Sequence, residues 1–292
     1  MVLMAASMNK SFDYHEAFSR NIGWVTEVEQ NILRSKRVAI AGMGGVGGAH
    51  VRTLSRLGIG KFNISDLDDF EVANFNRQAG ASVSQLGRPK IDVMAELALD
   101  INPELALNLF PAGINKDNLD QFLEGVDLYV DSLDFFSVGI RRAVFAACSE
   151  KNIPAITAAP LGMGTAFLCF MPGGMTFEEY FCMEGHDEKE QLIRFLLGLS
   201  PSMLQLPYLV DETRVNFEEH RGPSTIMACD LCAGVAASNA LKILLNRGKV
   251  PVAPRGLHVD AYRNKQKTTW RPWGNNNPIQ QLGLAIARKK LG

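Results

Sequence analysis

The stretch from Arg37 to Gly48 constrains the fold of this chain more than any other. The residues after Arg37 are short and apolar, as in a buried strand, and Gly42, Gly44 and Gly47 then fit the pattern G-x-G-x-x-G. Such glycines allow a tight strand-to-helix turn, let a phosphate approach the backbone and leave its charge at a helix N-terminus. The stretch therefore predicts a nucleotide-binding α/β unit, without indicating which nucleotide it binds.

An aspartate follows these glycines where a ribose-binding residue is expected. Asp66 comes 19 residues after Gly47, directly after a second apolar stretch, residues 61–65. A carboxylate in this place can accept hydrogen bonds from the hydroxyl groups of a ribose. The pair of features strengthens the prediction of a nucleotide site.

Apolar stretches and helical patterns alternate from residue 37 to about residue 171. This alternation predicts an α/β fold, with a doubly wound, mostly parallel, Rossmann-like sheet that carries helices on both faces. The expected strands are 37–41, 62–66, 106–110, 128–131, 155–158 and 166–170. The expected helices between them are 49–57, 90–100, 119–124 and 141–151.

We expect four segments along the chain. They are an N-terminal arm and helix at 1–36, a nucleotide-binding domain at 37–173, an insertion or crossover that faces the substrate at 174–224, and a C-terminal helix and tail at 225–292. The last segment is expected to pack on the nucleotide-binding domain, through an apolar helix at 226–245 and a strand near 257–261. The basic run 288–290 is expected to be solvated charge at the C-terminus of a helix.

Charge and composition argue against several classes of protein. The 292 residues include 30 basic and 31 acidic side chains and carry a net charge of −1, so no global field for nucleic acid or membrane is indicated. We find no apolar run that approaches the ~20 residues of a membrane helix and no signal peptide at the start. Five cysteines in a chain of this length do not suggest a disulfide framework, and a cytoplasmic protein is expected.

Polar side chains gather after three of the expected strands. The second strand is followed by acidic, amide and basic residues, the next helix opens with Lys90, and Asp131 and Asp134 follow the fourth strand. The carboxyl ends of strands share one crevice in an open α/β sheet. Cations there can offset charge on a phosphoryl group, and an aspartate can hold Mg²⁺. A site for hydride transfer does not need these cations and carboxylates, so the pattern favours a site for attack on the α-phosphate of ATP.

The chain contains, in this order, Gly-x-Gly-Gly-x-Gly at 42–47, Asp-x-Asp at 66–68, Asn-x-x-Arg-Gln at 74–78, Gly-x-x-Lys at 87–90 and Asp-x-x-Asp at 131–134. In their order and spacing these motifs resemble the ThiF/MoeB-type adenylyltransferases, the family that includes ubiquitin-activating enzymes. The resemblance covers residues 18–170 and 222–247. It implies that Gly45 backs the phosphates, that Asp66 holds the ribose and that Asp134 binds Mg²⁺. It also implies that Arg20 reaches the ATP of a partner subunit in a homodimer. The nucleotide-binding residues that we expect are Gly42, Gly44, Gly45, Gly47, Asp66, Asp68, Asn74, Asn76, Arg77, Gln78 and Lys90, and those expected to be catalytic are Arg20, Arg77, Lys90 and Asp134.

The resemblance also implies a reaction, with ATP and Mg²⁺ as cofactors. A carboxylate attacks ATP to give an acyl-adenylate and pyrophosphate. The carboxylate belongs in most members to the C-terminal glycine of a small ubiquitin-like or sulfur-carrier protein, and a peptide is a further possibility. We expect no general binding of nucleic acid.

Other interpretations remain open. Within the family, a threonylcarbamoyl-adenosine dehydratase acts on a modified tRNA. On the same fold, an oxidoreductase binds NAD or FAD, and a non-catalytic subunit of a heterodimer lacks the nucleotide site. Among the residues, Arg77 could pair with Asp68 or Asp69, Lys90 could be a surface lysine, and Asp131 could cap the next turn.

Cysteines suggest two further hypotheses. Cys229 and Cys232 have the spacing of a zinc-binding pair, but a structural zinc site needs four ligands and the chain has no second such pair, so zinc is not expected. Cys182 lies in the crossover region, where some relatives place a thioester-forming cysteine. The flanking acids Glu178, Glu179 and Glu184 would raise its pKa and weaken it as a nucleophile.

Overall fold

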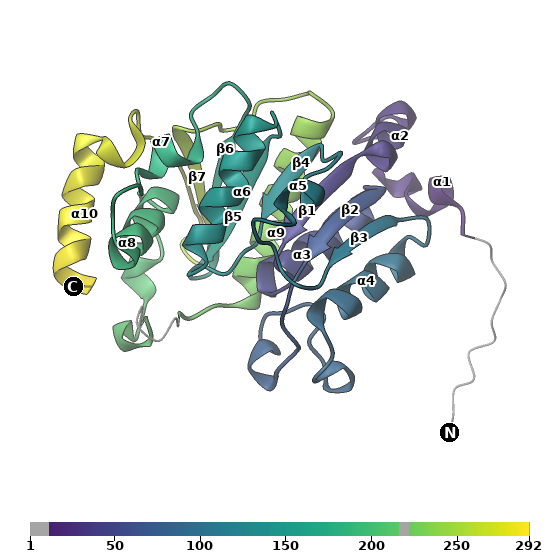
Figure 1. Ribbon diagram of the computed structural model, residues 1–292, viewed down its shortest axis with the longest axis horizontal. Helices are drawn as coiled ribbons and strands as arrows, with labels where there is room; N and C mark the ends of the chain where they lie inside the picture. The colour runs from purple at the N-terminus through teal and green to yellow at the C-terminus, as the bar shows by residue number, and fades with distance from the viewer. Residues whose placement is uncertain (1–11, 216–221, 292) are drawn as a thin grey trace.

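One sheet forms the centre of the molecule (Figure 1). The computed structural model describes residues 12–215 and 222–291. Within them the strands lie in the order β3-β2-β1-β4-β5-β6-β7-β8. Their bounds are β1 Arg37–Ala41, β2 Lys61–Ser65, β3 Ala106–Phe110, β4 Leu128–Asp131, β5 Ala155–Leu161, β6 Gly164–Phe170, β7 Arg255–Asp260 and β8 Lys265–Trp270.

The sheet is parallel in its first half and antiparallel in its second. Strands β1 to β5 pair in parallel, and β6, β7 and β8 are added in antiparallel fashion. Ala41 at the end of β1 pairs with Ser65 of β2 on one side and with Asp131 of β4 on the other. The chain order reverses at β1, so the carboxyl ends of these three strands flank the point where doubly wound folds bind ligands. The predicted fold class is confirmed, with three antiparallel strands at one side.

Helices cover both faces of this sheet. Helices α3, α4 and α9 contribute to the core on one face, and α5, α6, α7 and α8 to the core on the other. The helix bounds are α1 Tyr14–Ala17, α2 Glu27–Ser35, α3 Gly45–Leu57, α4 Lys90–Ile101, α5 Leu119–Phe122, α6 Val138–Glu150, α7 Phe177–Phe181, α8 Glu188–Leu199, α9 Ile226–Leu244 and α10 Pro278–Leu291.

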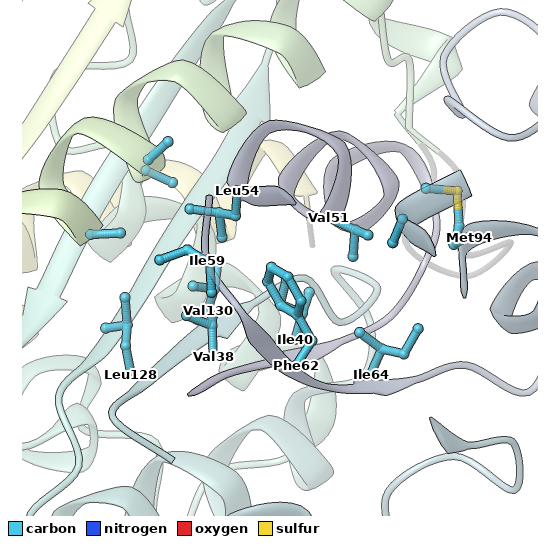
Figure 2. Packing of buried hydrophobic residues seen from close by; sticks show 14 of the residues in the cluster. Val38, Ile40, Val51, Leu54, Ile59, Phe62, Ile64, Met94, Leu128 and Val130 are labelled. Carbon is cyan, nitrogen blue, oxygen red and sulfur yellow. The ribbon is translucent and has the colours of Figure 1, made fainter. Parts of the chain in front are cut away.

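Alternation along β1 divides the core between the two faces. Val38 and Ile40 point toward α3, where they meet Val51 and Leu54 (Figure 2). Ala39 and Ala41 point to the other face and join the cluster under α6. All of these strand residues are fully buried, and each large apolar side chain among them contributes about 1.5–3 kcal/mol on burial. This core fixes the strand ends on which the polar residues lie.

Helix α9 packs against α3, β5 and β6. By length and composition alone it could cross a bilayer, which corrects the expectation that no apolar run approaches that length. Its buried face consists mainly of small residues, among them Cys229, Cys232, Ala233 and Ala236. Small side chains allow α3 and α9 to approach closely, so α9 is a core helix of this fold.

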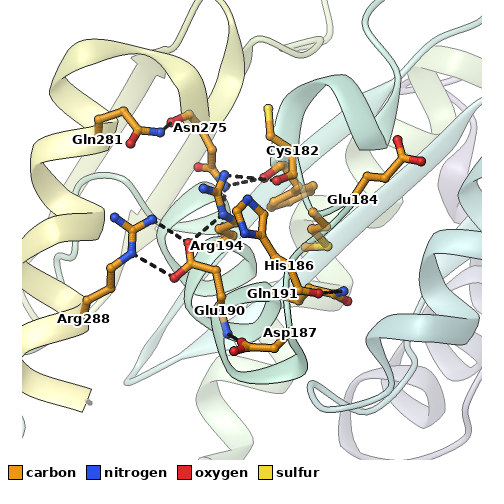
Figure 3. Close-up of polar contacts among 12 residues, drawn as sticks. Cys182, Glu184, His186, Asp187, Glu190, Gln191, Arg194, Asn275, Gln281 and Arg288 are labelled. Atoms are coloured by element: carbon orange, nitrogen blue, oxygen red, sulfur yellow. Dashed lines mark hydrogen bonds and ion pairs between the residues drawn. The ribbon is translucent and has the colours of Figure 1, made fainter.

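Strand β8 was not predicted, and for α10 only a helix C-terminus at 288–290 was expected. Helix α10 lies along α8 (Figures 1 and 3). Arg288 donates two hydrogen bonds, of 2.9 and 2.6 Å, to the carboxylate of Glu190, which also binds Arg194 at 2.7 Å. Asn275 donates to the carbonyl oxygens of Phe181 and Arg194. Arg288 is exposed, as expected for this basic run, but it also takes part in an ion-pair network that was not expected.

Candidate nucleotide-binding site

The glycine turn joins β1 to α3 at the carboxyl edge of the sheet. Gly42 has a φ of 93°, and a methyl group there would collide with the carbonyl oxygen of Ser132. A methyl group at Gly47 would collide with the carbonyl oxygen of Gly42. A methyl group at Gly44 would lie 3.7 Å from Nε2 of Gln78, which is an ordinary contact. The packing therefore requires glycine at Gly42 and Gly47, whereas Gly44 leaves space at the turn.

The N-terminus of α3 points to the same edge. This helix begins at Gly45, and its dipole places partial positive charge at the turn, which favours an anion there. A methyl group at Gly45 would lie 2.9 Å from Sγ of Cys229 and 3.3 Å from Cγ of Arg77. Arg77 and the first turn of α9 therefore form a wall beside the helix N-terminus.

Asp66 lies at the end of β2, across from this turn. Its carboxylate accepts hydrogen bonds from the backbone N–H of Met43, at 2.5 Å, and of Asp68, at 2.8 Å. Burial raises the pKa of the Asp66 carboxyl, and the two hydrogen bonds oppose part of that rise. The side chain is held against the glycine turn, in the place where the sequence predicts a ribose acceptor.

Lys90 opens α4 and is buried, with 8% of its side chain exposed. Its ammonium group donates to Oδ2 of Asp68 at 2.9 Å, and its backbone N–H donates to the carbonyl oxygen of the same residue. Lys90 is therefore not a surface lysine. Asp68, which the sequence places among the nucleotide ligands, has this lysine as its partner in the structure.

Arg77 follows the short helical turn after β2. Its Nη1 donates to the carbonyl oxygen of Ala73 at 3.0 Å and to Oδ1 of Asn76 at 2.9 Å. These bonds replace the ion pair with Asp68 or Asp69 that was one open interpretation. The amide of Asn76 in turn donates to the carbonyl oxygen of Ser224, at 2.9 Å. Arg77 is thus held by its own loop, which is attached to the residues just before α9.

Two buried amides complete the loop after β2. Oδ1 of Asn74 accepts from the backbone N–H of Glu71 at 2.9 Å and so closes the turn in which it lies. Gln78 is also buried, beside Gly44, and its Oε1 has no hydrogen-bond partner among the residues that the structure describes. A buried amide oxygen without a partner is costly, so Gln78 is a candidate for contact with a ligand.

The loop after β4 brings Asp131 and Asp134 to the neighbouring strand end. Asp131 is buried and accepts a hydrogen bond from Nε of Arg141 at 2.8 Å, with 2% of each side chain exposed. Asp134 is exposed, and its Oδ1 accepts from the backbone N–H of Phe136 at 2.9 Å. Asp131 also accepts a longer bond, of 3.3 Å, from the N–H of Leu133. The local cap expected for Asp131 therefore exists, but its main partner is Arg141.

Arg20 does not reach this crevice in its own chain. It is exposed on the short helical turn Ser19–Asn21. The side chains of Asn21 and Gln30 donate to the carbonyl oxygen of Leu57, at the C-terminal end of α3. That end is the one opposite Gly45, and the 13-residue helix is about 20 Å long. A role for Arg20 in trans remains a prediction.

Cys229, Cys232 and Cys182 have different surroundings in the structure. Sγ of Cys229 lies next to Gly45, and Sγ of Cys232 donates to Oγ1 of Thr165 at 3.1 Å. Along residues 12–215 and 222–291, no three potential His, Cys, Asp or Glu ligands group together. Cys182 ends α7 in a left-handed conformation, with φ of 52°. Burial is the main cause that raises its pKa, with the charge of Glu178 a lesser one.

Two contributors to the site were missed from the sequence. Arg141 was expected only as the start of a helix, and the backbone of Ser224 had no expected role. Nothing in the local sequence distinguishes Arg141 from its neighbour Arg142, because the difference is which side of α6 each occupies. These contacts depend on tertiary packing and have no local signal.

Comparison with known proteins identifies three groups of relatives. The chain is 34% identical over 145 residues to the tRNA threonylcarbamoyladenosine dehydratase of Bacillus subtilis (strain 168), covering 48% of this chain and 55% of the relative. It is 29% identical over 134 residues to the molybdopterin-synthase adenylyltransferase of Salmonella typhimurium, covering 46% and 53%. It is 32% identical over 248 residues to ubiquitin-like modifier-activating enzyme 5 of Drosophila persimilis, covering 77% and 58%. The matches span about half the length of these curated relatives.

A solved structure and a family model extend the comparison to almost the whole chain. The crystal structure of E. coli MccB with MccA-N7isoASN has a TM-score of 0.68 and 19% identity, and the match covers 93% of this chain and 75% of that one. At this identity the likeness establishes the fold. The model of the ThiF family matches residues 18–279. The protein therefore belongs to the ThiF family.

Proposed function

We propose that this protein is an ATP- and Mg²⁺-dependent adenylyltransferase that activates a carboxylate as an acyl-adenylate. One observation carries the proposal: the N-terminus of α3, the buried Lys90, Arg77 and the exposed Asp134 all lie at the carboxyl ends of neighbouring strands. Membership of the ThiF family and the similarity to a molybdopterin-synthase adenylyltransferase support it.

In the proposed reaction, a carboxylate oxygen attacks the α-phosphorus of ATP. A bond forms between that oxygen and phosphorus, the bond from the α-phosphorus to the bridging oxygen breaks, and pyrophosphate leaves. A carboxylate is already ionised near neutral pH, so the protein needs no general base. Its task is electrostatic: to hold the phosphates and to stabilise charge that develops on them.

Named residues fit these tasks. Backbone N–H groups at Gly44 and Gly45 and the dipole of α3 would hold phosphate oxygens, and Asp66 would hold the ribose. Arg77 and Lys90 would stabilise the charge on the α-phosphate and the departing pyrophosphate. For Lys90 this requires that a phosphate replace Asp68 as its partner.

Mg²⁺ fits as a companion of the nucleotide rather than as a resident ion. The loop after β4 offers one exposed carboxylate, Asp134, because Asp131 is occupied by Arg141. Mg²⁺ commonly keeps several waters and binds through one or two carboxylates together with substrate phosphates. Asp134 would hold it, and the ion would neutralise phosphate charge.

The acceptor is proposed to be the carboxyl terminus of a small ubiquitin-like or sulfur-carrier protein, or a peptide. The names of the adenylyltransferase and modifier-activating relatives, and the structure of MccB with MccA, support this class. The segment 174–224 is proposed to face it. A second candidate is threonylcarbamoyladenosine in tRNA, which is favoured by the similarity to the dehydratase of Bacillus subtilis.

ATP–pyrophosphate exchange with Mg²⁺ tests the reaction. Arg77→Ala should lower exchange about 10²–10³-fold, because it removes one preorganised donor to the phosphates. Arg88→Ala is the matched control, since Arg88 is bound to Glu96 on the outside of α4 and should leave exchange unchanged. Equal activity of wild type and Arg77→Ala would refute the assignment of this crevice.

The same assay distinguishes the acceptors. Exchange that appears only with a ubiquitin-like or sulfur-carrier protein, or with a peptide, supports the first candidate. Exchange that appears only with threonylcarbamoyladenosine-containing tRNA supports the second. Wild-type protein that neither exchanges nor binds ATP in calorimetry would overturn the proposed function in both forms.

Arg20 in trans can be tested by mixing two inactive variants. Arg20→Ala keeps its own Lys90, and Lys90→Ala keeps its own Arg20. If Arg20 acts across a homodimer, mixed dimers contain one site with both residues, and exchange returns after co-refolding. Mixtures that stay inactive would show that Arg20 does not act on the partner's nucleotide.

A further inference from the structure

Arg141 is buried at the first turns of α6, and its guanidinium reaches back into the loop after β4. Nε donates to Asp131 at 2.8 Å, and Nη2 donates to the carbonyl oxygens of Leu133, at 2.6 Å, and Asp134, at 2.9 Å. Nη1 donates to the carbonyl oxygen of Phe135 at 3.3 Å. One planar group thus binds the last residue of β4 and three residues of the loop that follows it.

These bonds fix the backbone on which the exposed carboxylate stands. The carbonyl oxygen of Asp134 accepts from Arg141 and also from the N–H of Ser137, at 3.0 Å. The Asp134 side chain then accepts from the N–H of Phe136. A guanidinium presents several donors in a rigid fork, so the positions of the carbonyl groups that it binds are fixed relative to one another.

Arg141 also joins this loop to the segment after residue 174. Its guanidinium carbon lies 4.5 Å from the centre of the Phe195 ring, on α8. A cation over an aromatic face is attracted by the ring electrons, and more strongly where water is excluded. The side chain of Arg141 therefore contacts both the loop after β4 and helix α8.

Stability alone does not account for a buried guanidinium here. A buried ion pair is often no more stabilising than apolar residues of the same volume, because both charges lose water. Arg142, the next residue, provides a contrast. It binds Glu178 at 2.8 Å with 29% of its side chain exposed, and in the part of the chain that the structure describes it makes no hydrogen bond to the loop after β4.

We propose that Arg141 is a positioning residue, which holds Asp134 where the Mg²⁺ that accompanies ATP can use it and ties that position to α8. The proposal rests on the proposed function for the role of Asp134. The geometric part, that Arg141 holds the loop, does not depend on any ligand. Groups that orient a metal ligand commonly affect metal affinity or activity 10–100-fold.

Arg141→Lys and Arg142→Lys form a matched pair for the test. A lysine at 141 can keep the charge beside Asp131, which favours folding, but a single ammonium cannot bind the three carbonyl groups as a fork does. ATP binding is measured by calorimetry with and without Mg²⁺. We expect Arg141→Lys to lose about 10-fold or more of the gain in ATP affinity that Mg²⁺ gives, and Arg142→Lys to keep it.

Asp134→Asn provides the reference for this measurement. If Asp134→Asn loses the gain from Mg²⁺ while Arg141→Lys keeps it, the positioning role is refuted. If neither wild type nor variants bind ATP, the proposed function fails instead. In that case hydrogen exchange decides the geometric part, because it needs no nucleotide.

Amide exchange of peptides that cover residues 132–138 is the second readout. Their N–H groups include those of Phe136 and Ser137, which bond within the loop. Arg141→Lys should speed their exchange at least tenfold, whereas Arg142→Lys should not. Equal protection in wild type and both variants would overturn the proposal.

Discussion

The ends of β2 and β4 both combine aspartates with a basic side chain from the following helix, but in opposite arrangements. After β2, Lys90 binds the second aspartate, Asp68, and the first, Asp66, accepts backbone N–H groups. After β4, Arg141 binds the first aspartate, Asp131, and the second, Asp134, is exposed. Each loop therefore joins one carboxylate to an internal cation.

The ion pairs Arg141–Asp131 and Lys90–Asp68 differ in burial. A fully buried pair holds the structure together, whereas a partly exposed pair can separate when a ligand takes the place of one partner. Arg141 and Asp131 are both 2% exposed, whereas Asp68 is 58% exposed beside an almost buried Lys90. Water can solvate Asp68 if Lys90 turns to a phosphate, but it cannot reach Asp131 in the same way. The spacing of acidic residues in the sequence is similar in both loops, so spacing alone does not indicate which carboxylate is free to act.

Loss of the buried pair should produce the largest effect. Arg141→Met leaves Asp131 buried without its cation, and we expect the free energy of unfolding to fall by about 3–5 kcal/mol. Urea unfolding monitored by circular dichroism measures it. Arg142→Met, which breaks a half-exposed pair, should cost about 1 kcal/mol or less. Similar losses in the two variants would mean that burial does not distinguish these arginines.

Acid should have an effect of intermediate size, which arises on α3 and not in either loop. His50 is fully buried on α3, and burial lowers its pKa from 6.5 to about 3. Below pH 6.5 the unfolded chain binds a proton there that the folded protein does not, so stability is lost as the pH falls. Each pH unit between about 6 and 4 should remove up to about 1.4 kcal/mol.

The variant His50→Leu removes this proton uptake. Its free energy of unfolding should therefore change less between pH 7 and pH 5 than that of wild type, in the same urea assay. His15→Gln removes an exposed histidine and serves as the control. If His50→Leu loses as much stability between pH 7 and pH 5 as wild type does, the pH dependence arises from other groups.

Loss of the ion pair between Lys90 and Asp68 should give the smallest effect. Asp68→Asn keeps an oxygen that can accept from Lys90, and we expect a loss of about 1 kcal/mol or less in urea unfolding. Asp131→Asn, the same change in the other loop, should cost more because its partner is a buried guanidinium. If Asp68→Asn costs as much free energy of unfolding as Asp131→Asn, the pair of Lys90 and Asp68 is needed for stability, and a phosphate would not replace Asp68 as the partner of Lys90.

Local sequence was sufficient for the elements that surround the site. The glycine turn, the strand ends and the start of α4 at Lys90 follow from apolar periodicity and from the steric needs of Gly42 and Gly47, which act within a few residues. That the polar residues after β2 and β4 lie at the same edge of the sheet also followed, because parallel strands align their carboxyl ends.

The choice of ion-pair partners, strand β8 and the start of α10 could not be predicted in this way. Whether Lys90 binds Asp68, or Asp131 binds Arg141, depends on how helices lie on the sheet. Strand β8 is an edge strand that is exposed along most of its length, so it lacks the apolar alternation that identifies a strand. Helix α10 has apolar residues on its exposed side too, such as Ile279 and Leu282, which blurs its periodicity.

The contact between Gly45 and Cys229 has a consequence for how the protein matures on the ribosome. The wall beside the helix N-terminus comes from α9, about 180 residues after the turn. At about 5–20 residues per second, the ribosome needs roughly 10–40 seconds to synthesise that stretch. During this time the strands β1 to β5 can pair, but the nucleotide turn stays open on one side. Fragments that end before α9 should therefore be poor nucleotide binders, and competence to bind should arise late in synthesis.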